Sequence, residues 1–102
     1  MKMIKKIIDQ IYDELEGSEE YIECAMKEKA EHPTIANMYY EMSLMEMSHV
    51  DKLHSAVVTL INEAKAKGEE PPAHMMAIYE YEHEKIMEEA TEIKVMQEMY
   101  KR

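Results

Sequence analysis

The chain has 102 residues, and 22 acidic residues against 12 basic ones give it a formal net charge of −10 at pH 7. This length predicts one domain with a single core, small enough that self-association is expected. The negative charge repels phosphate backbones and anionic membrane surfaces, which argues against nucleic acid and membranes as partners. Cys24 is the only cysteine and has no intrachain disulfide partner, which indicates a reducing cytoplasm.

The composition predicts an all-α fold. The chain contains 12 Met, only two Gly and three Pro, and no Phe or Trp. Apolar residues recur at helical spacing in three segments of one domain, residues 1–102. The predicted helices cover about residues 2–31, 34–67 and 72–101. Because the loops between them are short, neighbouring helices should be antiparallel, in an up-down-up order.

The first segment has an apolar stripe on one face. The stripe consists of Ile4, Ile8, Ile11, Leu15, Ile22 and Ala25 or Met26. Its one irregularity is Gly17-Ser18, where we expect a kink or a close approach of another helix. The segment ends near His32-Pro33, because the residue before a proline leaves the α region.

The second segment contains a polar pair on its apolar stripe. The stripe consists of Ile35, Met38, Met42, Met45, His49, Leu53, Ala56 or Val57, and Leu60. Glu46 lies three residues before His49, so both side chains point to the same side of the helix. A polar pair on an apolar face costs free energy unless it has a partner, and a metal ion between helices is such a partner. Since the composition predicts roughly one Glu-x-x-His pair by chance and two occur, position is the informative feature.

The third segment contains the other such pair, Glu80 and His83. In an antiparallel bundle, residues 90–93 lie level with Glu46 and His49, so Glu80 and His83 are about 10 residues, or ~15 Å, away from that level. We therefore expect this pair to form a surface or interface hydrogen bond rather than to complete the first site. Turn or surface positions account for the other three histidines, His32, His54 and His74.

A carboxylate from the first helix should lie level with the Glu46/His49 pair. The pair follows the turn proline, Pro33, by 13 and 16 residues, and counting back 13 to 17 residues from Pro33 reaches Glu20, Glu19 and Glu16. On a helical wheel Glu19 lies nearest the apolar direction, Glu16 lies further from it and Glu20 points away. Glu16 and Glu19 both remain candidates.

Three stretches of this chain resemble the helix-turn-helix of the ferritin-like superfamily, particularly rubrerythrin-like proteins and short encapsulated ferritins. They are Tyr12-Asp13-Glu14-Leu15-Glu16, His32-Pro33-Thr34-Ile35-Ala36 and Glu46-Met47-Ser48-His49, and the resemblance covers about half of the chain. The encapsulated-ferritin pattern falls on Glu16, Glu46 and His49. In longer members a Tyr follows the first-helix Glu by seven residues, and that pattern falls on Glu14 and Tyr21 instead.

The resemblance implies a shared di-metal site. Two copies would meet across a twofold axis, as a homodimer or within a larger homo-oligomer, and their hairpins would complete a four-helix bundle. Carboxylates and imidazoles without thiolates favour iron, with manganese and zinc as alternatives. The implied activity is binding and oxidation of Fe(II) by dioxygen, of the ferroxidase type, for iron storage or detoxification, in the cytoplasm or inside a protein compartment.

Two other functions fit the same residues. The chain could be a non-catalytic helical bundle for interaction or assembly, in which the Glu/His pairs only stabilise the core or an interface. It could also be a metal-stabilised oligomer without catalysis. Bound metal and oxidation rate separate these three hypotheses.

Overall fold

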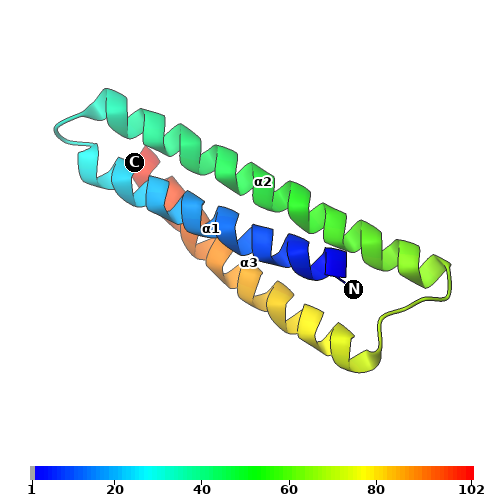
Figure 1. Ribbon diagram of the computed structural model, residues 1–102. Coiled ribbons are helices and arrows are strands. Elements are labelled where there is room, and N and C mark those ends of the chain that lie inside the picture. The colour runs from blue at the N-terminus through cyan, green and yellow to red at the C-terminus, as the bar shows by residue number, and fades with distance from the viewer. Residues whose placement is uncertain (1) are drawn as a thin grey trace.

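The computed structural model describes residues 2–102, so Met1 of the predicted domain lies outside the described residues. The chain folds into helices α1 (Lys2–Glu28), α2 (Pro33–Ala66) and α3 (Ala73–Lys101). Helices consecutive in the chain run antiparallel, α1 and α3 run parallel, and the three form a rod of 57 × 18 × 18 Å (Figure 1). All regular structure in residues 2–102 is helical, which confirms the predicted all-α class. Within this range, the helices lack an apolar stretch long enough to cross a bilayer.

Proline and glycine delimit the helices near the predicted positions. Pro33 is the first residue of α2, where its fixed φ suits the first turn and its missing N–H costs nothing. After α2, Gly68 adopts a φ of 71°, and the Glu69 N–H donates to the Ala64 carbonyl at 2.8 Å. Glycine takes this left-handed conformation without steric cost, so it ends the helix and turns the chain toward α3.

Helix α1 is the central element of the bundle. It packs along α2 and also against α3, whereas α2 and α3 contact each other least (Figure 1). The predicted apolar stripe of α1 is buried, which explains how one helix supplies core to two neighbours. Its buried apolar residues are Ile4, Ile7, Ile8, Ile11, Leu15, Ile22 and Ala25. Tyr12 also connects α1 to α3, since its hydroxyl donates a hydrogen bond to the Glu82 carboxylate on α3.

The buried face of α2 differs from the predicted stripe. Met38 and Met45, expected in the core, are 43% and 60% exposed, whereas Met47 and Val50 are 5% and 3% exposed. Apolar residues occur around much of α2, so periodicity alone does not select one face. Close packing against α1 selects the face that carries Ser43, and the side with His49 is left partly open.

Three polar side chains form a hydrogen-bonded cluster inside the bundle, one from each helix. Ser18 Oγ donates to the Ser43 carbonyl oxygen at 2.8 Å, and Ser43 Oγ donates to the Ser18 carbonyl oxygen at 2.7 Å. Gln97 Nε2 donates to Ser43 Oγ at 3.0 Å. Such reciprocal bonds require the two backbones to approach closely, which only small residues permit. The irregularity at Gly17-Ser18 is therefore a close helix approach within a continuous α1.

We expect Ser43→Ala to lower the free energy of unfolding by about 1–3 kcal/mol, because the buried Gln97 amide loses an acceptor and Ser18 loses a partner. Urea unfolding followed by circular dichroism measures this change. Ser48→Ala is the matched control, since Ser48 is exposed on the same helix and bonds only the Met45 carbonyl. An equal stability of the two variants would contradict a structural role for the cluster.

Candidate metal centre

Glu14 of α1 and Glu46 and His49 of α2 form a compact group of metal-ligating side chains. Taking one ligand atom from each, these atoms all lie within 4.8 Å of one another. His49 Nδ1 is 3.3 Å from Glu14 Oε2 and 3.9 Å from Glu46 Oε1. The predicted Glu46/His49 pair therefore does meet a carboxylate of the first helix, and that carboxylate is Glu14.

The register of the α1/α2 hairpin explains why Glu14 occupies this place. The loop between Glu28 and Pro33 has its midpoint between residues 30 and 31, not at Pro33. In an antiparallel hairpin, residues equally far from the midpoint lie level with each other. Residues 46 and 49 therefore lie level with residues 15 and 12, on either side of Glu14. Counting from the turn proline instead displaces the prediction toward Glu16 and Glu19.

Glu16 and Glu19 are not in this group. They line a different surface groove, between α1 and α3, together with Glu89 and Glu92. Burial raises the pKa of Glu19, and the neighbouring charge of Glu23 raises it further. Within one chain, the structure thus brings Glu14 to Glu46 and His49 and directs the two other candidates toward α3.

Gly17 provides the space that the Glu46 side chain occupies. A Cβ atom at position 17 would lie 2.9 Å from Glu46 Oε2, closer than van der Waals contact allows. Gly17 lies one helical turn after Glu14. The Glu46 carboxylate therefore packs directly against the α1 backbone at Gly17, where no side chain intervenes. The sequence pattern around Gly17 predicts a kink or a close helix approach, and a glycine one turn after a candidate ligand is the signal for this second role.

The two carboxylates of the group influence each other's ionisation. A hydrogen bond with Glu14 raises the pKa of Glu46, with burial as the next cause. The same hydrogen bond, followed by the contact with His49, lowers the pKa of Glu14. These directions describe a carboxylate pair that favours sharing one proton, Glu46 as donor and Glu14 as acceptor. A bound cation removes the repulsion between the charged forms in the same way.

The group is open to solvent on the side away from α3. The side chains of Glu14 and Glu46 are 28% and 27% exposed, and that of His49 is 46% exposed. The adjoining groove is lined only by residues of α1 and α2, including Gln10 and Leu53. Three protein ligands leave coordination positions free for exchangeable ligands, which distinguishes this arrangement from a closed structural site.

Comparison of the chain with protein families, curated proteins and solved structures finds no match. The assignment of the site therefore depends on its geometry. Two carboxylates and one imidazole form an oxygen-rich donor set that suits Fe(II) or Mn(II), while zinc also accepts these ligands.

We expect Gly17→Ala to separate helix stability from the integrity of the site. Alanine in a helix interior is favoured over glycine by about 1 kcal/mol, and the flexible end of Glu46 can move aside, so the fold should be retained or stabilised. The displaced Glu46 carboxylate should lose its hydrogen bond with Glu14. The pKa of Glu46 should then fall toward the ordinary value of a glutamate. Carboxyl NMR titration of the metal-free protein measures this pKa. An unchanged Glu46 pKa would show that Gly17 does not position this side chain.

Glu46→Gln should stabilise the metal-free protein at pH 7. A raised Glu46 pKa contributes stability that is fully present below the ordinary pKa of glutamate and is lost as pH rises through the folded-state value. The amide avoids this loss and can still donate to Glu14, so we expect a gain of about 0.5 kcal/mol at pH 7, discounted for partial exposure, and little gain at pH 4. Urea unfolding with a chelator present measures both. Glu20→Gln is the charge-matched control, and a loss of stability at pH 7 would contradict the inferred repulsion.

Proposed function

We propose that this chain binds redox-active metal ions, with iron as the favoured ion, through Glu14, Glu46 and His49. The observation that carries the proposal is the convergence of their ligand atoms within 4.8 Å on the face of the α1/α2 hairpin that α3 leaves uncovered. The Glu-x-x-His pair of α2 and a carboxylate of α1 also match the half-site that the ferritin-like resemblance implies.

We further propose that two chains share the centre. One group supplies three ligands, which is half of what two adjacent metal ions require. Apolar side chains flank the group on the same side of α2, where Met38 and Met45 are 43% and 60% exposed. A twofold contact between two such faces buries this surface and completes a four-helix bundle from two hairpins.

Iron is a substrate in this proposal. Two Fe(II) ions supply two electrons, and dioxygen accepts them together with two protons, which gives two Fe(III) ions and hydrogen peroxide. A redox-inactive structural ion would not need the coordination positions that a group of three protein ligands leaves open. The single unpaired Cys24 fits a reducing cytoplasm as the place of this chemistry.

Each side chain has a distinct role in this proposal. His49 coordinates through Nδ1 as a neutral imidazole, the form in which histidine binds metals. Glu46 lies between Glu14 and the backbone of Gly17, where its carboxylate can bridge to a second ion. Because the metal replaces the proton that Glu46 and Glu14 share, binding releases protons, and the affinity rises as the pH rises through the raised pKa of Glu46.

The test is an anaerobic Fe(II) titration followed by addition of oxygen, with bound iron and oxidation rate as the two measurements. We expect about two Fe(II) ions per dimer, and a loss of at least tenfold in affinity and rate for Glu14→Ala, Glu46→Ala and His49→Ala. Analytical ultracentrifugation of the same samples should show a dimer or a larger assembly.

Control variants separate this site from nonspecific binding to an acidic protein. Glu20→Ala removes the same charge from an exposed position of α1, and His74→Ala removes an exposed imidazole at the start of α3. Both should bind and oxidise iron like the wild type. Less than one ion per dimer, or equal losses in site and control variants, would contradict the proposal, and a stable metal-free dimer without iron binding would favour an assembly module instead.

A further inference from the structure

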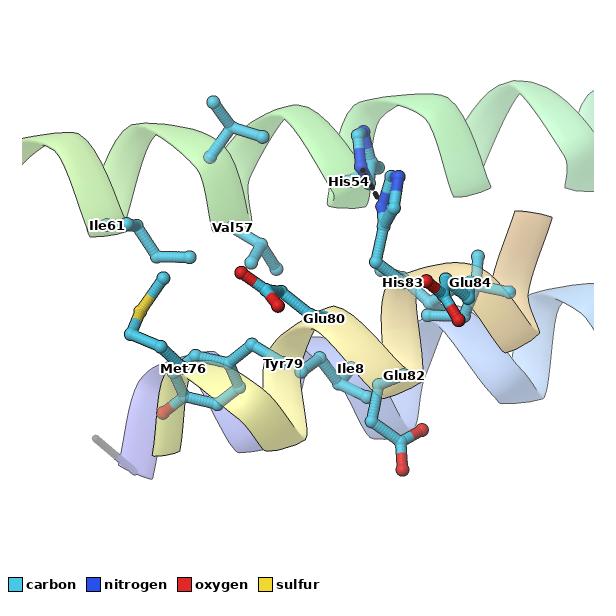
Figure 2. Close-up of a pocket in the computed structure, with 13 residues that line it drawn as sticks. Ile8, His54, Val57, Ile61, Met76, Tyr79, Glu80, Glu82, His83 and Glu84 are labelled. Atoms are coloured by element: carbon cyan, nitrogen blue, oxygen red, sulfur yellow. Dashed lines mark hydrogen bonds between the residues drawn. The ribbon is translucent and has the colours of Figure 1, made fainter. Parts of the chain in front are cut away.

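A second cluster of ligating groups lies between α2 and α3. His54 of α2 and His83 of α3 face each other across the space between these helices (Figure 2). His54 Nε2 is 3.1 Å from His83 Nδ1, with ring centroids 5.0 Å apart and ring planes inclined by 33°. The sequence pattern predicts a surface position for His54 and a hydrogen bond for His83, but it does not pair the two residues. Reflection of residue 83 through the midpoint of the loop between Ala66 and Ala73 reaches residue 56, within one helical turn of His54.

The surroundings of the pair are mostly apolar. The two imidazoles border a cavity of about 280 Å³ whose wall includes Val57, Ile61 and Met76. Glu80 lines the same cavity one turn before His83, and its carboxylate is directed toward α2 (Figure 2). The two nitrogen donors face each other, whereas the Glu80 carboxylate lies beside Val57 and outside a compact three-ligand group, so it must rotate toward the histidines to reach a shared ion (Figure 2).

The spacing of the two nitrogens suits a chelated metal ion. With metal–nitrogen bonds of about 2.0–2.1 Å, nitrogens 3.1 Å apart subtend an angle of about 98° at the ion. This lies between the angles of about 90° in octahedral or square-planar sites and about 109° in tetrahedral sites. An ion thus requires the rings to reorient but does not require the helices to separate.

We propose that His54 and His83, with Glu80 as third ligand, bind a divalent ion of the zinc, nickel or copper type and clamp α2 to α3. The donor set is richer in nitrogen than the Glu14/Glu46/His49 group, so its preference shifts from iron and manganese toward these ions. The clamp acts where the bundle is weakest, because α2 and α3 contact each other least. This proposal does not depend on the function proposed for the first group.

The test uses the full chain with Glu46→Gln and His49→Gln as background, so that the first group cannot account for binding. Zn²⁺ is titrated by calorimetry into the chelator-treated protein, and thermal unfolding is recorded with and without Zn²⁺. We expect one ion per chain and a rise of about 10 °C in Tm at 100-fold excess over Kd. With Cu²⁺, electron paramagnetic resonance should show coupling to two nitrogens.

In this background, His54→Gln or His83→Gln should abolish the Tm rise and the two-nitrogen signal, whereas His74→Gln should leave both intact. Because His83 is exposed, its substitution leaves the fold in place, which circular dichroism checks. Glu80→Gln should weaken Zn²⁺ binding about tenfold, and an unchanged affinity would overturn its assignment as a ligand. Absence of Zn²⁺ binding in the background protein, or binding that persists without His54, would show that the histidines form only a hydrogen bond.

Discussion

The close contact of α1 and α2 at Ser18 and Ser43 fixes the geometry on which the rest of the molecule depends. Each serine hydroxyl bonds the backbone carbonyl of the other helix, so the two helices can neither slide nor rotate without breaking buried hydrogen bonds. This contact sets which residues of the hairpin are level with each other. Glu14 lies one turn before it on α1, and Glu46 lies nearly one turn after it on α2, so the ligand group is a direct consequence of the serine register.

The same contact determines which side of α2 is buried. A 34-residue helix with apolar residues around much of its circumference can bury more than one face. Packing through Ser43, Met47 and Val50 leaves Met38 and Met45 on the outside, next to His49. The apolar surface that a single chain cannot cover is thus the surface that surrounds the candidate metal ligands, and this connects the proposed dimer with the proposed chemistry.

Much of the architecture could be predicted from the sequence, because Pro33, Gly68 and the stripe of α1 are strong local signals. The Glu46/His49 pair was predicted for the same reason, since its spacing is local. Prediction of the first-helix ligand requires the register of two helices. The loop midpoint lies two to three residues before Pro33, and counting from Pro33 instead favours Glu16 and Glu19 over Glu14. The buried face of α2 and the His54/His83 pair likewise depend on how the helices pack against each other. The periodicity of apolar residues within one helix carries no information about that packing.

The hairpin also has a consequence for the order in which the molecule folds. Glu14, Glu46 and His49 all lie within residues 2–66, and a loop of only four residues joins their two helices. Closing so short a loop costs little entropy, and the contacts it permits are between neighbouring elements, which form rapidly. We therefore expect Gln97 and the rest of α3 to dock onto a hairpin whose register the serines have set. During synthesis on the ribosome, the ligand group is therefore complete in the chain before α3 has emerged.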